Sequence, residues 1–447
     1  MAGSGSGFEW MERLFRLSEN GTTVRTELLA GLTTFVTMAY ILFVNPNILK
    51  DAGMPVEATF AATCVASAFA TLLMGLLANY PIAVAPGMGL NAYFTYTVCI
   101  GMRLPWQTAL GAVFMSGVVF FLLTVTRVRE WIIEGVPQVL RLSISVGIGL
   151  FIAFIGLRNG GIIVKNDATL VALGDMRSHG VLVAVAGLLL TVFLMARRIR
   201  GGLLLGILAT AAAAILAGVS PAPHGLSSFA TLSDPFLALK ATAFQMDVAA
   251  ALKVGLFSIL FSFTFVDLFD NVGTLIGVSR KAGLLDQKGS LPRIGRALLA
   301  DSVGTMFGAL MGTSTVTSYV ESAAGVAEGG RTGLTAVVTA LLFLLALVFA
   351  PMVGLIPPQA TAPALIVVGV LMTTDIRSIR FDDFTEAVPA FLTMLMMPLT
   401  YSIAQGLAFG FTSYTLVKLL AGRHRENSAV TYTLAALFIL HFILSRR

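Results

Sequence analysis

Charged residues are scarce in this chain of 447 residues. Lys, Arg, Asp and Glu make up 12% of it, whereas an average soluble domain is about a quarter charged. The hydrophobic share is 57%, and the mean hydropathy is +0.88. Because so few charges cannot cover a surface that faces water, we expect a polytopic membrane protein of the all-α class.

Cysteine and histidine are also rare. Cys64 and Cys99 both lie in apolar stretches, which argues against a disulfide framework or a metal site. The four histidines stand alone, and we expect loop or membrane-edge positions for them: His179, His224, His424 and His441. The basic residues form short clusters between apolar runs, which is typical of membrane topology rather than of nucleic-acid binding. The sequence therefore predicts no metal, no cofactor and no nucleic-acid partner. It shows no secretory signal peptide, and the opening "MAGSGSG" is left out of the fold argument.

Apolar runs of about 20 residues, the length that crosses a bilayer, predict fourteen spans in two groups of seven. The first group lies near 27–45, 57–78, 84–100, 105–126, 136–157, 180–197 and 202–218. The second group lies near 250–276, 294–311, 313–329, 332–352, 356–374, 385–401 and 402–421. A further apolar stretch, 430–444, either crosses the membrane or lies along its inner surface.

The distribution of basic residues predicts a cytoplasmic N-terminus. Arg and Lys concentrate in the loops that this orientation places inside, such as the one with Arg197, Arg198 and Arg200. The outer loops hold fewer: Lys50, Arg103, Arg158, Lys165, Arg177 and Lys240. We therefore expect a multi-pass protein of the cell inner membrane or plasma membrane.

The two groups of seven spans show weak internal repetition. "RIRGGLLLGILATA" (198–211) resembles "SIAQGLAFGFTSYT" (402–415), and "VPQVLRLSISVGIGL" (136–150) resembles "IPPQATAPALIVVGVL" (356–371). These pairs fall at equivalent places, in spans seven and fourteen and in spans five and twelve. Since seven is odd, the second copy enters from the opposite side, which favours an inverted-repeat transporter over a channel.

Two segments at equivalent places, spans three and ten, are too short and too polar for ordinary spanning helices. They are "VAPGMGLNAYFTYTV" (84–98) and "GTSTVTSYVESAAGVAEGG" (312–330). Pro86, Gly87 and Gly89 disfavour helix in the first, and the Thr/Ser run of the second can cap a helix that begins near Val316. We expect two half-helices, each preceded by extended backbone, whose N-termini meet near the midplane. Irregular backbone persists at that depth only inside protein or beside a cavity, so a binding site is expected there.

Acidic residues occur in the spans around these half-helices. Span eight carries four polar residues that share one helical face: Asp267, Asp270, Asn271 and Thr274. Asp301 lies in span nine and Glu321 in span ten. No Lys, Arg or His lies in the inner part of these spans, so some acids must be protonated part of the time or bind a cation. Such a face cannot point to lipid.

The candidate ligand contacts follow from these positions. They are Glu321, Asp270, Asp267, Asn91, Thr274 and Thr317, with Phe94 or Phe265 as the aromatic that stacks on a planar ligand. Asp267 and Asp301 have a structural alternative, because each could instead hold a helix contact through hydroxyls or backbone. Asn91 could instead satisfy loose backbone within its broken helix.

The blocks around these residues resemble the nucleobase–cation symporter-2 family, and within it the azaguanine/hypoxanthine/adenine permease branch. They are "APGMGLNAYF" (85–94), "VDLFDNVGTLIGVSRKAGLLD" (266–286), "ADSVGTMFGALMGTSTVTSYVESAAGV" (300–326) and "EGGRTGLTA" (328–336). The similarity runs from about residue 25 to about residue 420. Proteins of this kind take up purine bases with protons, so the resemblance implies a purine and H⁺ as partners, with Na⁺ less expected.

The resemblance also implies an architecture. Spans 1–4 and 8–11 would form a core domain (25–129 and 248–353), and spans 5–7 and 12–14 a gate domain (130–220 and 354–422). Tails would occupy 1–24 and 423–447, and a homodimer through the gate domain is possible in such proteins. In this branch the positions of Asn91, Asp267, Asp270 and Glu321 are implicated in binding and transport. Thr274 stands where uracil carriers have a histidine, which argues against a uracil carrier.

The mechanism that we expect is alternating access. Burial favours the neutral form of an acid, so we hypothesise that Asp270, or the Asp267/Asp270 pair, carries the proton, with Asp301 as a further candidate. Glu321 would bind the base. The alternatives are a uracil or xanthine carrier, an anion transporter of the sulfate-permease type on the same fold, an intramembrane aspartyl protease, and a channel or receptor. Four acids argue against an anion site, and an aspartate pair on one helix argues against an enzyme.

Overall fold

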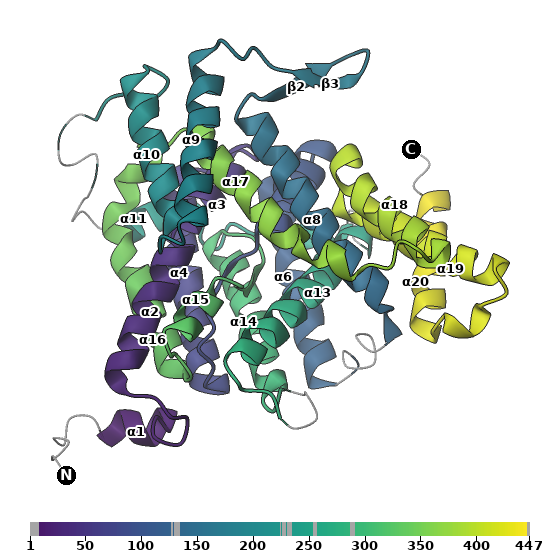
Figure 1. Ribbon diagram of the computed structural model, residues 1–447, viewed down its shortest axis with the longest axis horizontal. Helices are drawn as coiled ribbons and strands as arrows, with labels where there is room; N and C mark the ends of the chain where they lie inside the picture. Colours follow the sequence, from purple (N-terminus) through teal and green to yellow (C-terminus); the bar gives the residue numbers. More distant parts are fainter. Residues whose placement is uncertain are drawn as a thin grey trace.

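The computed structural model describes residues 9–126, 128, 135–223, 225, 229, 235–253, 257–286 and 291–444. The opening "MAGSGSG", His224 and residues 254–256 of the predicted eighth span lie outside these ranges. Helices dominate the fold, and the two short sheets each have two strands. Figure 1 shows the N-terminal helix α1 (Glu9–Phe15) at one end of the bundle and the hairpin of β2 (Ile163–Asn166) and β3 (Leu170–Leu173) at the other.

The first seven predicted spans are present. Their elements are α2 (Val24–Met38) with α3 (Ile41–Lys50), α4 (Val56–Leu73) with a π-helical turn (Met74–Ala78), β1 (Val84–Pro86) with α5 (Met88–Ala92) and a π-helix (Tyr93–Gly101), α6 (Trp106–Val125), α8 (Gln138–Asn159), α9 (His179–Ala196) and α10 (Gly202–Leu216). The third of these is a broken span, as the sequence predicts.

The second seven follow after two short helices, α11 (Pro235–Leu239) and α12 (Val248–Lys253). Their elements are α13 (Phe257–Lys281), α14 (Ile294–Met311), β4 (Val316–Ser318) with α15 (Ser322–Ala327), α16 (Gly333–Leu345) with a 3₁₀ segment (Ala346–Leu355), α17 (Pro358–Met372) with a 3₁₀ segment (Thr373–Ser378), α18 (Phe384–Thr400) and α19 (Ile403–Leu420). Within the described residues, eight helical segments are long and apolar enough to cross a membrane. The other six spans are the two broken ones and four that are shorter or less apolar.

One predicted boundary is wrong. A helix is expected to begin near Val316, but Val316–Ser318 is the strand β4, and α15 begins at Ser322. Span eight is expected over 250–276; α12 and α13 are helical within and beyond this range, to Lys281, and residues 254–256 between them lie outside the described residues.

The C-terminal apolar stretch forms the helix α20 (Ala429–Leu444), which packs against the bundle. The Phe438 ring meets Phe261 of α13 edge-on, with ring centroids 4.9 Å apart. It also stacks near Phe411 of α19, at 6.1 Å. Figure 1 shows α20 beside α18 and α19.

The helices pack in two groups. In one, α14 packs on α4 and α6, and α16 packs on α2 and α4; in the other, α17 packs on α8 and α9, and α18 packs on α8 and α19. Contacts between the groups are sparser and include α5 with α8 and α13 with α19. The first group holds both broken spans.

Small residues allow close approach between span one and the half-helix of span ten. A Cβ added to Gly325 in α15 would overlap the hydroxyl of Thr34 and lie 2.5 Å from the carbonyl oxygen of Ala30, both in α2. The Thr339 hydroxyl on α16 donates to the Gly31 carbonyl of α2 at 3.1 Å. The half-helix α15 is therefore fixed against α2.

We predict that Gly325→Ala lowers the free energy of unfolding by about 1–3 kcal/mol, the usual range for overpacking a tight contact. The measurement is the melting temperature of the purified protein in detergent. Gly277→Ala on α13 is the control, because nothing lies within 4 Å of a Cβ there. Equal melting temperatures for Gly325→Ala and wild type would contradict the close packing of α15 on α2.

Candidate functional site

The two broken spans cross at their extended segments. β1 and β4 pair antiparallel, with Val84 opposite Ser318, Ala85 opposite Thr317 and Pro86 opposite Val316. The half-helices α5 and α15 begin just after the two strands. An antiparallel meeting of equivalent segments is what a two-fold axis in the membrane plane produces. The predicted pair of half-helices with extended backbone before each is confirmed.

Side chains from neighbouring spans satisfy the backbone of this crossing. The Thr71 hydroxyl both accepts from the N–H and donates to the C=O of Val84, each at 2.9 Å. The Thr305 hydroxyl donates to the Val316 carbonyl at 3.1 Å. Three further bonds complete the set: Tyr319 Oη to Pro86 O (2.5 Å), Ala83 N to Ser322 Oγ (3.0 Å) and Gly87 N to Thr315 O (3.0 Å).

Glu321 lies where β4 turns into α15, and it meets acids and phenols. Its Oε1 accepts from the Tyr40 hydroxyl of span one at 2.6 Å, and its own backbone N–H also donates to the carboxyl. Asp270 of α13 interacts electrostatically with Glu321, and Tyr319 interacts with both acids. The acids of spans eight and ten are thus near enough to interact electrostatically.

One face of α13 is turned toward both broken spans. Phe263, Asp267, Asp270 and Thr274 lie at helical spacing on this face. The Phe263 ring meets Tyr93 of span three edge-on, with ring centroids 5.1 Å apart. About two turns further along α13, Asp270 interacts electrostatically with Glu321 of span ten. Asp267 lies between these contacts and is 2% exposed.

Several buried polar atoms near the crossing have no hydrogen-bond partner among the described residues. Asn91 of α5 accepts at Oδ1 from the Ser314 hydroxyl, but its Nδ2 is unpaired. The Thr317 hydroxyl on β4 is unpaired and 1% exposed. Both amide atoms of Asn271 are unpaired as well. Buried groups of this kind are costly unless a ligand or water bonds them.

The other candidates lie further from these groups. Phe94 is completely buried in the hydrophobic core. Phe265 stacks on Phe261 with centroids 4.1 Å apart, and at 100° per residue it lies roughly 140° around α13 from Asp270. A role of either ring in stacking on a ligand stays a prediction. Asp301 is completely buried on α14, one turn before Thr305.

Sequence reasoning missed Tyr40 and Tyr319. A tyrosine in the middle of an apolar span signals a nearby acceptor, because a buried phenol needs one. "TMAYILF" around Tyr40 carries that signal. Glu27 in α2 was also overlooked, but it is satisfied within the protein. Its carboxylate accepts from the N–H of Arg331 (2.8 Å) and from the N–H and hydroxyl of Thr335 (3.1 and 2.6 Å) at the start of α16.

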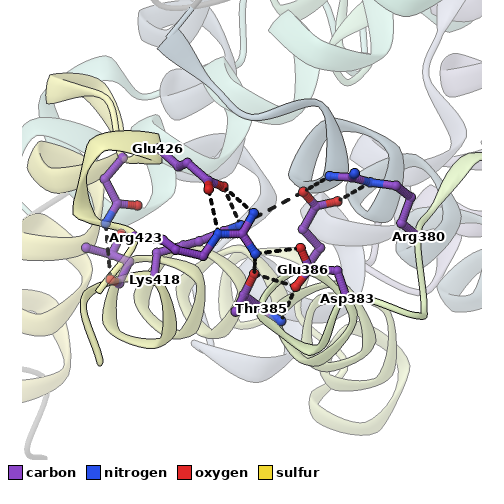
Figure 2. A network of polar contacts seen from close by, with 9 residues as sticks. Arg380, Asp383, Thr385, Glu386, Lys418, Arg423 and Glu426 are labelled. Atoms are coloured by element: carbon purple, nitrogen blue, oxygen red, sulfur yellow. Dashed lines mark hydrogen bonds and ion pairs between the residues drawn. The ribbon is translucent and has the colours of Figure 1, made fainter. Parts of the chain in front are cut away.

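A separate charged network lies in the other group of helices. Arg423 donates to Asp383 (2.7 Å) and Glu426 (2.5 Å), and the completely buried Lys418 donates to Glu426 at 2.6 Å, as Figure 2 shows. Hydrogen bonds from Thr385 and Arg423 hold the pKa of the Asp383 carboxyl below its usual range.

A cavity of about 550 Å³ adjoins this network and is lined by Arg380, Glu386, Tyr414 and Glu426 among others. None of the predicted site residues lines it, and the ionised side chains are paired with one another. We therefore propose the crossing as the functional site. Among the described residues, no group of three His, Cys, Asp or Glu side chains could hold a metal ion.

Fourteen spans, two interrupted helices that meet at their extended segments and polar side chains beside them define a transporter of the inverted-repeat class. The transmembrane domain of a cyanobacterial bicarbonate transporter, BicA, has this fold: the TM-score is 0.62 at 14% identity, over 85% of this chain and 97% of that one. SLC26A9 gives a TM-score of 0.63 at 12% identity, over 94% and 70%. These likenesses show the fold, two inverted seven-span repeats with core and gate domains.

The chain belongs to the Permease family, whose sequence profile matches residues 25–409. The resemblance to nucleobase–cation symporters-2 is thereby confirmed, and the protein is a transporter rather than an enzyme. A putative permease of Methanocaldococcus jannaschii is 52% identical over 97% of this chain and 98% of its own length. The adenine permease AdeQ of Escherichia coli is 47% identical (97% and 96%), and the guanine/hypoxanthine permease PbuG of Bacillus subtilis 46% (97% and 99%).

We predict that Thr317→Val reduces uptake without reducing the melting temperature. The substitution keeps the side-chain shape and removes a hydroxyl that has no partner in the described residues. Thr305→Val is the matched control: it leaves the buried Val316 carbonyl without its donor and should cost about 1–3 kcal/mol of stability. A fall in melting temperature for Thr317→Val as large as that for Thr305→Val would show that the Thr317 hydroxyl is structural.

Proposed function

We propose that this protein imports purine nucleobases, hypoxanthine and guanine or adenine, together with protons by alternating access. The observation that carries the proposal is the approach of Asp270 and Glu321 beside two interrupted helices. Relatives with similar sequences over nearly the full chain are adenine and guanine/hypoxanthine permeases, which supports a purine as the ligand.

The polar groups at the crossing match the edges of a purine. The Glu321 carboxylate accepts from ring N–H groups and, in guanine, from the neighbouring amino group as well. The unpaired Nδ2 of Asn91 donates to a ring nitrogen or a carbonyl oxygen, and the Thr317 hydroxyl can do either. The N-terminal ends of α5 and α15 add favourable dipoles for a carbonyl oxygen.

Proton coupling follows from the electrostatic interaction of two partly buried acids. Two neighbouring carboxyls away from water cannot both be ionised cheaply. Within the described part of the chain, no salt bridge includes Asp270 or Glu321. In the proposal Asp270, alone or with Asp267, takes the proton that lets Glu321 bind the base as a carboxylate. Asp301 remains a further candidate for the proton, and Na⁺ a less favoured coupling ion.

The movement that we propose is a shift of the core (25–129 and 248–353) against the gate (130–220 and 354–422). Residues 127, 129–134, 254–256 and 287–290 of these ranges lie outside the described part. In the same proposal the N-terminus is cytoplasmic, the protein lies in the inner or plasma membrane, and a homodimer forms through the gate.

Exchange of the two acids for amides tests this assignment. We expect Glu321→Gln to weaken purine binding by roughly 10- to 150-fold, which corresponds to the loss of a hydrogen bond to a charged group at about 1.5–3 kcal/mol. We expect Asp270→Asn to stop substrate-driven proton flux while thermal stabilisation by the base persists. The measurements are radiolabelled uptake, pH changes in proteoliposomes and melting shifts.

Glu57→Gln is the control for these variants, because Glu57 is exposed at the start of α4. Proton-coupled uptake that is unaltered in both Glu321→Gln and Asp270→Asn would refute the assignment. A panel of hypoxanthine, guanine, adenine, uracil and sulfate in the melting assay separates purine transport from the uracil and anion alternatives.

An ion pair between the two helix groups offers a test of the movement. Arg200, between α9 and α10, donates to Glu328 at the end of α15, with 2.5 Å between Nη2 and Oε1. If the core shifts against the gate, this pair forms in one state and breaks in the other. Because partly exposed pairs contribute about 1 kcal/mol or less, we expect Arg200→Gln to change the uptake rate by up to roughly fivefold.

The charge reversal Arg200→Glu with Glu328→Arg should restore the wild-type rate. Arg16→Gln is the control, because Arg16 pairs with Glu19 three residues away and joins no two helix groups. Equal rates for Arg200→Gln, Arg16→Gln and wild type at low salt would contradict a role for the pair in the movement.

A further inference from the structure

Span one contributes Tyr40 to the site, a side chain that is not one of the acids. Its two helices break at Tyr40, since α2 ends at Met38 and α3 begins at Ile41. The Tyr40 ring is 1% exposed, and its hydroxyl donates to Oε1 of Glu321 at 2.6 Å. Tyr40 of the first repeat is therefore hydrogen-bonded to Glu321, which lies directly before the half-helix α15 of the second repeat.

The bond satisfies two groups that are otherwise costly in a membrane. A buried phenol needs an acceptor, and a buried carboxylate needs donors. Hydrogen bonds to an ionised acceptor are roughly twice as strong as neutral ones. The pair is thus a strong contact between span one and span ten.

Other groups near Glu321 cannot replace Tyr40. The Tyr319 hydroxyl, two residues before Glu321, already donates to the Pro86 carbonyl at 2.5 Å. Asp270, which interacts with Glu321 electrostatically, is an acid and repels it when both are ionised. Among the described residues, Tyr40 is the one side chain that donates to Glu321, and the Glu321 backbone N–H is the other donor.

The packing fixes this geometry before a ligand arrives. Gly325 on α15 lies against Ala30 and Thr34 of α2, so the two elements cannot slide apart without losing that contact. Tyr40 is two residues beyond the end of α2, and Glu321 is directly before α15. Preorganised polar groups bind a ligand at lower entropic cost than mobile ones do.

We propose that Tyr40 is a positioning residue for base binding: its hydroxyl holds one oxygen of Glu321 and leaves the rest of the carboxylate to accept from the N–H groups of the base. This role of Tyr40 rests on the proposed function, because the proposed function assigns a ligand contact to Glu321. Loss of the hydroxyl lets the Glu321 side chain rotate, so the base binds less tightly while the transport step itself is unchanged.

The chain offers a matched control in Tyr96 and Asp51. The Tyr96 hydroxyl donates to Oδ2 of Asp51 at 2.8 Å, which is the same phenol–carboxylate bond in a partly buried place between span three and the end of span one. Tyr96→Phe therefore removes an equivalent hydrogen bond that does not involve Glu321.

The experiment measures KM and maximal uptake rate for radiolabelled hypoxanthine, guanine and adenine in proteoliposomes, with melting temperatures of the same preparations. We expect Tyr40→Phe to raise KM about tenfold and to leave the maximal rate within about twofold. Tyr96→Phe should leave KM unchanged. An unchanged KM in Tyr40→Phe, or an equal rise in both variants, would overturn the positioning role.

A second arm asks whether Tyr40 acts through Glu321. Glu321→Asp shortens the side chain by one methylene and withdraws the carboxyl from the Tyr40 hydroxyl, so adding Tyr40→Phe to it should change KM no further. A full additional tenfold rise in the double variant would mean that Tyr40 acts elsewhere and would overturn the proposal. A wild-type protein that neither binds nor transports any of the three purines would refute the proposed function itself, and this role with it.

Discussion

The crossing of β1 and β4 is the interaction on which the rest of the site depends. A bilayer offers no water to backbone N–H and C=O groups, so a helix can stop inside it only where protein supplies the missing partners. Here each strand pairs with the other, and hydroxyls of Thr71 and Thr305 bond the strand backbone from outside. With these groups satisfied, α5 and α15 can begin in the middle of the bundle. The first N–H groups of α15 are bonded within its own turn, since Ser322 and Ala323 donate to the carbonyls of Tyr319 and Val320.

Buried acids in this protein fall into two kinds, which the structure separates by their partners. Glu27 accepts several hydrogen bonds from the start of α16 and so completes a helix N-terminus. It needs no ligand. Glu321 has a phenol and its own N–H as donors and a second acid, Asp270, as neighbour. The same residue type is therefore satisfied within the protein at the completely buried Glu27, whereas the partly buried Glu321 has fewer donors.

Much of the fold could be predicted because the membrane imposes a length on each span and a high cost on each charge. Fourteen spans, the two broken ones and the face of Asp267, Asp270 and Thr274 follow from those rules alone. The start of the half-helix in span ten was misplaced, because the Thr/Ser run before it forms the strand β4 rather than a helix cap. Tyr40 was missed for another reason. Its partner lies 281 positions away, and periodicity within one helix gives no information about contacts between repeats.

The origin of the polar groups bears on how such a site could move. Tyr40, Asn91, Asp270 and Glu321 all come from spans one, three, eight and ten, which belong to one of the two helix groups. The other group approaches the half-helix α5 with apolar side chains: a Cβ on Gly89 would meet Ile148 of α8 and Ile403 of α19. Apolar contacts are non-directional, so one set can replace another at little cost, whereas a broken buried hydrogen bond leaves an unpaired group. A shift between the groups can therefore keep the polar contacts to a ligand intact and exchange mainly apolar contacts around it.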